Sequence, residues 1–310
     1  MKKFFQSTAK KNRHFTKESK AGDWLFPLIF GLLLSAFALM CVYPFWYVFI
    51  FSLSDSKQAA SGLGLLPKGF TLQHYSVVFS FKTIYGAFMI SASRAIIGTL
   101  VTLFFSSMFA YVLTKGQLKG RKLMYRIMIV SMYISAGLIP WYIVMRFYGL
   151  KDNYLLYILP AAVAPYFVIL IKTYIEQFPP SLEESAFIDG ANSLQIFISL
   201  ILPLSIPVLA AVGVFSAVSQ WNSWTDNFYL VRNPRLQTLQ LLLLDILNQS
   251  EAISRAMQRE QNFDMLKKIS ITPMAIRMTI TMVTIIPILL VYPFMQRYFI
   301  KGIMLGAVKG

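Results

Sequence analysis

The chain has 310 residues, of which 56% are hydrophobic, 15% are aromatic and only 14% are charged. Soluble domains carry roughly 25% charged residues, and a globular helical bundle of this length would need far more polar surface. The composition therefore excludes an ordinary soluble protein and predicts an all-α integral membrane protein.

The formal net charge of +16 is concentrated in two segments. Residues 1–23 contain seven lysines and arginines, and residues 115–126 contain five. Basic residues next to apolar spans mark the cytoplasmic side of a membrane protein. This distribution predicts a topology with both segments in the cytoplasm rather than a nucleic-acid-binding protein.

Six stretches are poor in charge and long enough to cross a hydrocarbon core about 30 Å thick, which needs roughly 20 apolar residues. We expect a basic tail at 1–23, a transmembrane domain at 24–298 with its core at 83–298, and a C-terminal tail at 299–310. With six spans both termini lie on the cytoplasmic side of the cell membrane. The predicted spans are 25–51, 83–113, 124–145, 154–175, 200–224 and 272–294.

The predicted topology leaves one long outer loop at 226–271, in which residues 239–247 read as a helix too short to span the membrane. Cys41 is the only cysteine, so it forms no internal disulfide, and His14 and His74 form no metal constellation. The sequence thus predicts no metal site and no catalytic residue.

The loop between the fourth and fifth spans, 181–200, contains acids but no lysine or arginine, since none occurs between Lys172 and Arg232. Ser181 followed by Glu184 forms a capping-box pattern, which predicts a short helix starting after the paired prolines. Gly190 can end that helix, and Asn192 or Ser193 can cap a second one. We expect another protein to cover this acidic loop.

This loop resembles the EAA motif of ABC importer permeases, which reads approximately E-A-A-x-x-D-G-A, then variable residues with a Phe and an Ile, then L-P. Ser185 stands where the motif has its first alanine and Leu200 where it has isoleucine. The matching residues are Glu184, Ala186, Asp189, Gly190, Ala191, Phe197, Leu202 and Pro203.

The resemblance implies a type I ABC importer permease fold with a cytoplasmic coupling helix, which docks into a cleft of the ATPase subunit and transmits its closure. Ala186 would allow close approach, Glu184 would offer a carboxylate and Gly190 would turn the chain. The purely structural alternative is that Glu184 only caps its own helix and Gly190 only ends it.

The C-terminal segment from Gln296 to Gly310 resembles the tail of maltose-permease-type carbohydrate permeases, which ends in a similar K-G pattern. The resemblance implies that the tail reaches the ATPase dimer, whereas the alternative is a frayed terminus without function. The residues expected to contact the ATPase are Lys301, Gly302, Gly306 and Lys309. The chain is most similar in character to permeases for complex oligosaccharides of the polygalacturonan type.

A cluster of polar and aromatic residues at the end of the fifth span, 219–226, has the mixture that sugar sites use. The alternative is an aromatic belt at the membrane interface. If the cluster lines the substrate path, we expect Gln220, Trp221 and Asn222 to matter rather than Trp224.

Arg94 lies roughly three turns inside its span, where an ionisable side chain is a candidate for function. It could meet an anionic sugar, or it could pair with a carbonyl or an acid of a second permease subunit, which we favour. Lys172 and Arg277 lie nearer to span ends and can snorkel to the interface.

The chain has no G-x-x-x-x-G-K-[ST] motif, so it cannot bind ATP through a P-loop. The resemblance implies a permease subunit, not an enzyme, that works with two ATPase subunits carrying ATP and Mg, a second permease that is related or identical, an extracytoplasmic binding protein and membrane lipid. The expected cargo is an oligosaccharide; the alternatives are a polyamine, phosphate or amino acid. A secondary transporter or a membrane-embedded enzyme is less consistent, because neither coupling acids nor a catalytic group occurs at membrane depth.

Overall fold

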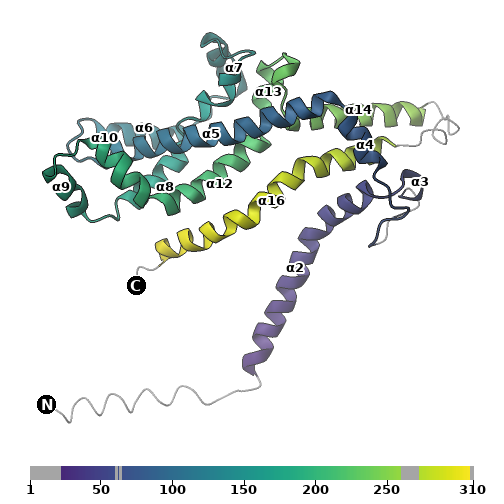
Figure 1. The fold of residues 1–310 in the computed structure, drawn as a ribbon, viewed down its shortest axis with the longest axis horizontal. Helices are drawn as coiled ribbons and strands as arrows, with labels where there is room; N and C mark the ends of the chain where they lie inside the picture. Colours follow the sequence, from purple (N-terminus) through teal and green to yellow (C-terminus); the bar gives the residue numbers. More distant parts are fainter. Residues whose placement is uncertain (1–21, 60–61, 63–64, 260–271, 308–310) are drawn as a thin grey trace.

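The computed structural model describes residues 22–59, 62, 65–259 and 272–307 (Figure 1). Every regular element in these ranges is a helix, and the one β-bridge joins Ser54 to Phe70. Three helices are each long and apolar enough to cross a membrane: α2 (Gly22–Ser52), α5 (Lys82–Thr114) and α16 (Pro273–Ala307). They match the first, second and sixth predicted spans.

Two further predicted spans are bent pairs. The fourth begins with the 3-10 turns η2 (Tyr154–Tyr157) and η3 (Leu159–Ala161) and turns by 44° into α8 (Pro165–Ile175). The fifth runs through α10 (Ser193–Ile196), a π-helix η4 (Phe197–Ile201) and α11 (Leu202–Leu204), and then turns by 80° into α12 (Ile206–Asn222). Counting each pair as one span gives up to five crossings among the described residues.

The third predicted span, expected as one helix, is broken. Helix α6 (Arg121–Tyr133) ends at an extended residue, Ile134, and α7 (Leu138–Phe147) starts only after Gly137. Gly137 has φ +81°, a conformation that glycine adopts at no steric cost. A continuous helix through 124–145 is therefore a wrong prediction, because the left-handed glycine separates the two halves.

Helix α5 forms the centre of the bundle and packs against α8 and α12. Its buried face consists mostly of small residues, which allow helix backbones to approach closely. Thr102 donates to the carbonyl oxygen of Ala161 at 2.8 Å, and Ser106 accepts the backbone N–H of Ala164 at 3.1 Å. These bonds satisfy backbone groups that the break between η3 and α8 leaves free.

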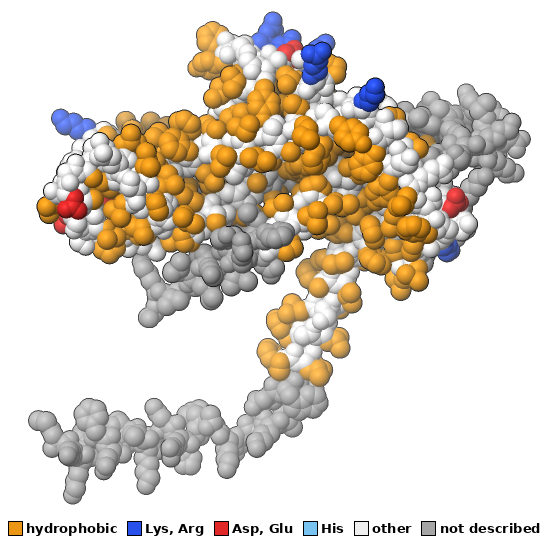
Figure 2. Space-filling model, viewed as in Figure 1, with side chains coloured by type: hydrophobic (Ala, Val, Ile, Leu, Met, Phe, Trp, Pro, Cys, Tyr) orange, Lys and Arg blue, Asp and Glu red, His pale blue; other side chains and the backbone are white. Residues whose placement is uncertain are grey.

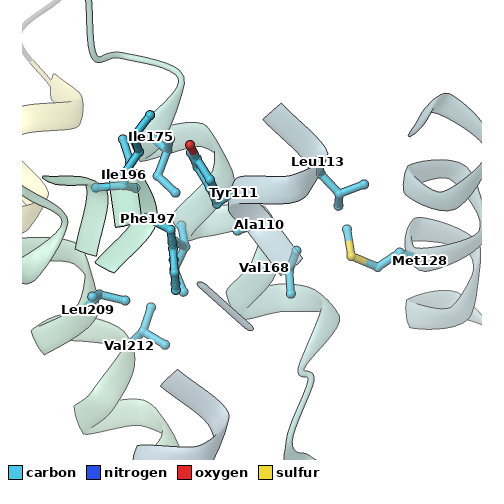
Figure 3. Close-up of a cluster of buried hydrophobic side chains, with 12 residues drawn as sticks. Ala110, Tyr111, Leu113, Met128, Val168, Ile175, Ile196, Phe197, Leu209 and Val212 are labelled. Carbon is cyan, nitrogen blue, oxygen red and sulfur yellow. The ribbon is translucent and has the colours of Figure 1, made fainter. Parts of the chain in front are cut away.

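A cluster of buried side chains at one end of the bundle joins α5, α8, α10, η4 and α12 (Figure 3). Phe197 is 1% exposed and stacks on Tyr111, with ring centroids 5.5 Å apart. The loop at 181–200 is thereby anchored to the membrane helices by apolar packing.

The other end of the bundle carries the short helices α3 (Ser56–Ala59), α4 (Gln73–Ser80), α13 (Thr225–Leu230) and η5 (Pro234–Leu236), and the longer helix α14 (Leu239–Arg259). The predicted helix at 239–247 is confirmed as the first part of α14. Leu239 is fully buried, and Leu242 and Ile246 pack against the cluster of Val78, Ile84 and Ile280. The Asp226-to-Ile271 segment thus contains structure up to Arg259, and residues 260–271 lie outside the description.

Most of α2 extends away from the bundle, and its contact with α16 is made near its C-terminal end (Figure 1). None of its apolar window is buried within the chain. Figure 2 shows hydrophobic side chains along α2 and across the visible face of the bundle. This apolar surface is that of a multi-pass membrane protein, for which lipid is the solvent.

Asp152 joins two loops at the end of the bundle near α7: the loop between α7 and η2 and the loop between α13 and η5. Its carboxylate accepts the backbone N–H groups of Arg232 and Asn233 at 2.5 and 3.0 Å, and these bonds lower the pKa of Asp152. Asp152 also has φ +52°, a left-handed conformation that aspartate tolerates better than most residues.

We expect Asp152→Ala to lower the thermal unfolding temperature of the detergent-solubilised protein by a few degrees, because it removes the acceptor and strains the backbone. Because the pKa of Asp152 is lowered in the folded protein, its ionised carboxylate stabilises the fold at pH values above 3.8, the usual aspartate pKa. This stabilisation is lost as the pH falls through the lower pKa of the folded protein. Acidification should therefore destabilise the wild type more than the variant. Lys151→Ala, an exposed neighbour, serves as the control, and an equal loss in both variants would contradict this role.

Candidate functional site

The predicted coupling helix is α9 (Pro180–Ile188), and its start differs from the prediction. Pro179 occupies the N-cap position and no side chain caps the helix. Proline suits the first helical position because its φ is fixed and it has no N–H to satisfy. The helix therefore begins one residue before Ser181, and the predicted capping box of Ser181 and Glu184 is wrong.

The end of α9 is as predicted. Gly190 has φ +83°, its N–H donates to Phe187, and the N–H of Ala191 donates to the carbonyl of Ala186. These two bonds form a Schellman motif, which reverses the chain and satisfies the last carbonyls. Asn192 then caps α10 through a full capping box with Gln195.

The acids of the loop are in different environments. Glu183 forms an ion pair with Lys115, which follows α5, and the Lys115 ammonium also lies 4.0 Å from the centre of the Tyr111 ring. Glu184 and Asp189 are exposed and form no ion pair within the described part of the chain. Because Glu184 caps no helix, its carboxylate is free to bind a partner.

A groove of about 630 Å³ separates α9 from α10 and η4. Ile188, at the end of α9 beside this groove, is 85% exposed. Glu184, Phe197, Leu202 and Pro203 do not line the groove. The residues that line it are Leu182, Ser185, Ala186, Asp189, Gly190, Ala191, Gln195, Ile196, Ser199 and Leu200.

The loop continues into α12 through a segment that departs from a regular α-helix. The π-helix η4 and α11, which holds Leu202 and Pro203, precede the 80° bend at Ser205. The Ser205 hydroxyl is buried and has no hydrogen-bond partner in the described structure. From this bend, α12 continues to Asn222 and carries Gln220 near its C-terminal end.

Arg94 of α5 is 4% exposed and binds Asp226 of α13 in the same chain. Its Nη1 and Nη2 donate to the two carboxylate oxygens at 3.0 and 2.5 Å. Nε donates to Gln220 Oε1 at 2.8 Å, and Nη1 also donates to the carbonyl of Ser223 at 3.3 Å. This in-chain partner corrects the expectation that a second subunit supplies it.

A cavity of about 320 Å³ opens beside this ion pair, between α5, α12, α13 and the turns η2 and η3. The Arg94 guanidinium lies 4.6 Å from the centre of the Tyr157 ring. The Tyr157 hydroxyl is bonded to Leu236 and Asn227. The lining residues are Arg94, Trp141, Leu156, Tyr157, Pro160, Ala161, Ser219, Gln220, Ser223, Thr225 and Asp226.

Of the residues predicted for a substrate path, Arg94 and Gln220 line this cavity, whereas Trp221 and Asn222 do not. Trp221 is buried on the opposite side, where its Nε1 donates to the carbonyl of Thr284 and its ring packs edge-on against Phe88. The aromatic residues beside the cavity are Trp141 and Tyr157. Sequence reasoning missed both, because they lie far from α12 in the sequence and no motif or regular spacing connects them to it.

The remaining charged candidates are placed as follows. Lys172 forms an ion pair with Glu176 at 2.6 Å, and Arg277 Nη2 donates to the carbonyl of Leu247 at 3.5 Å. Lys301, Gly302 and Gly306 lie on α16, and Lys309 lies outside the described residues. The described chain holds no group of three or more metal-ligating side chains.

Comparison with known proteins identifies the family. The chain is 38% identical over 287 residues to the polygalacturonan/rhamnogalacturonan transport system permease protein YtcP of Bacillus subtilis (strain 168). The aligned region covers 91% of this chain and 97% of the relative. The chain belongs to the carbohydrate ABC transporter permeases. Members of this family are transport subunits, not enzymes.

Further relatives agree. Protein LplC of the same organism is 35% identical over 298 residues, covering 96% of this chain and 99% of the relative. A crystal structure of a bacterial ABC transporter involved in the import of the acidic polysaccharide alginate matches with a TM-score of 0.81 and 29% identity, covering 92% of this chain and all of that chain. No protein-family model matches the chain.

Because the Arg94–Asp226 ion pair is buried, we expect removal of one partner to lower the free energy of unfolding strongly. Arg94→Met leaves the Asp226 carboxylate buried and unpaired, so we expect a loss of about 3–5 kcal/mol in stability. Combining it with Asp226→Leu should recover most of that loss. Thermal or denaturant unfolding of the solubilised protein measures both.

Lys172→Met is the control, because its partner Glu176 is 45% exposed and a pair of this kind contributes about 0–1 kcal/mol. A loss for Arg94→Met no larger than for Lys172→Met would show that the Arg94 pair does not stabilise the fold.

Proposed function

We propose that this permease moves an oligosaccharide across the cell membrane by alternating access, driven by ATP hydrolysis on partner chains. An extracytoplasmic binding protein delivers the sugar to the outer face. Two ATPase subunits, which carry ATP and Mg, act on the loop 181–200 in the cytoplasm. A second permease, related or identical, completes the pathway.

Support for the coupling role comes from the loop itself. Its helix α9 combines a groove of about 630 Å³, an unpaired Glu184 and a tip at Ile188 that is 85% exposed. An acidic and apolar tip on an otherwise well-anchored loop is a surface suited to a protein partner. Phe197 anchors the loop to α5 by stacking on Tyr111, so a displacement of α9 would be transmitted to the membrane helices.

The proposed topology has six crossings with both termini in the cytoplasm. Three continuous helices and two bent pairs give up to five crossings. The broken pair α6 and α7 would supply the remaining one, since the two halves together contain residues 121–147. The basic residues at 115–126 then lie on the same side as α9, in agreement with the Lys115–Glu183 ion pair.

The cavity beside Arg94 is the proposed contact point for the sugar. It combines hydroxyl, amide and aromatic groups, which suit the two kinds of surface that a pyranose ring presents. Support for a sugar rather than a polyamine, phosphate or amino acid comes from relatives whose names specify polygalacturonan, rhamnogalacturonan, arabinooligosaccharides and galactooligosaccharides.

The coupling role is tested by Gly190→Val in the complete transporter reconstituted in liposomes. A Cβ at Gly190 meets no atom within 4 Å, so the substitution acts only through the left-handed backbone, φ +83°. We expect this change to reorient the end of α9 and to abolish sugar uptake, while ATP hydrolysis continues without stimulation by the loaded binding protein.

Gly120→Val is the matched control. Gly120 has φ +84° and an equally open environment, but it precedes α6. Both variants should lose similar stability, whereas only Gly190→Val should lose uptake. Normal uptake in Gly190→Val, or equal loss in both variants, would refute the coupling role of α9.

A further inference from the structure

The electrostatics of the cavity beside Arg94 indicate which part of a saccharide it accepts. We propose that this cavity binds the uncharged, hydroxyl-bearing part of a glycan, and that Asp226 sets this specificity by keeping carboxylate groups out. The proposal rests on the function proposed above and concerns the same cavity.

The guanidinium of Arg94 is almost saturated. It has five N–H groups in a planar fork, and Asp226, Gln220 and Ser223 accept four of them. The ring of Tyr157 lies over the guanidinium, 4.6 Å from its central carbon. One N–H on Nη2 remains, whereas a carboxylate binds arginine through two parallel hydrogen bonds.

The cavity is also neutral overall. Arg94 and Asp226 are the only lysine, arginine, aspartate or glutamate residues in its lining, and their charges cancel. Their side chains are 4% and 12% exposed, so little water screens them. A uronate carboxylate entering the cavity would approach the Asp226 carboxylate and lose its own hydration, without gaining a free cation.

Neutral hydroxyl groups find better partners in the same lining. Ser219 and Thr225 line the cavity, are exposed, and have no side-chain hydrogen bond in the described structure, and Gln220 is oriented by accepting the Arg94 Nε–H. Leu156 and Pro160 offer apolar contact, and Trp141 offers a ring face on which sugars can stack. The volume, about 320 Å³, suits a ligand of one or two sugar rings.

α-1,4-Linked galactotriose and α-1,4-linked trigalacturonate form a matched pair of probes, because they differ only in whether C6 is a hydroxymethyl group or a carboxylate. Binding to the assembled transporter without its binding protein is followed by quenching of tryptophan fluorescence. Trp141→Phe identifies the signal that comes from the cavity. We expect the wild type to bind galactotriose about tenfold or more tightly than trigalacturonate.

Asp226→Asn tests the cause of this preference. The amide keeps an acceptor for Arg94 but removes the negative charge, so the cavity gains a net positive charge and the preference should shrink below about threefold or reverse. Asp245→Asn is the control, because Asp245 lies on α14 outside the cavity lining and is bonded to Gln237. It should leave the ratio unchanged.

Two results would overturn the proposal: equal or tighter binding of trigalacturonate by the wild type, or an unchanged ratio in a folded Asp226→Asn variant. If that variant does not fold, the ratio measured on the wild type decides. ATP-driven uptake measured in parallel distinguishes failure of the charge specificity from failure of the proposed function. Uptake with an unfavourable binding ratio refutes the charge specificity alone, whereas absence of ATP-driven uptake of any saccharide refutes the proposed function.

Discussion

A buried arginine in a membrane helix must be neutralised, and this constraint organises the end of the bundle that carries α13. Arg94 lies on α5, and its only ion-pair partner in the described chain is Asp226, 132 residues later. The carboxylate belongs to α13, which follows α12 after Ser223 and Trp224. The ion pair therefore fixes the end of α12, the position of Gln220 and one wall of the cavity.

The same helix α12 begins at the bend after the proposed coupling loop. Phe197 and Tyr111 hold the loop against α5 at one end, and Arg94 holds α12 to the same helix at the other. Between these points Gly98 allows close packing, since a Cβ there would lie 2.8 Å from Gln220 Nε2. Helix α5 is continuous and carries both Tyr111 and Arg94, so it connects the proposed site of ATPase contact with the proposed site of sugar contact. The π-helix η4 and the 80° bend at Ser205 lie between the loop and α12, and π-helical turns inside α-helices are frequent at functional sites.

Sequence patterns predicted the helical class, the approximate positions of the long helices, and the turn at Gly190 with the cap at Asn192. These features depend on local chemistry: apolar run length, a glycine that accepts positive φ, and a side chain that caps a helix. The breaks were missed where an apolar run continues through a turn, as at Gly137 and Ser205. The start of α9 was misplaced because Pro180 competes with Ser181 for the beginning of the helix.

The contents of the cavity could be predicted only in part. Arg94 and Gln220 stood out as polar residues in apolar spans, but the Arg94–Asp226 and Lys115–Glu183 pairs join residues 132 and 68 positions apart. No feature of the sequence distinguishes Trp141 and Tyr157 from the other aromatic residues of the chain. No local pattern specifies such pairings, because they arise only when the helices pack.

Under the proposed function, ATPase subunits on other chains supply the energy for transport through this chain. The most direct measurement is uptake of a labelled oligosaccharide into liposomes that contain either the complete transporter or this chain alone, with ATP inside and ion gradients imposed separately. We expect uptake only with the complete transporter and ATP, whether or not an ion gradient is present. Uptake by this chain alone, driven by a proton or sodium gradient, would refute the proposed function.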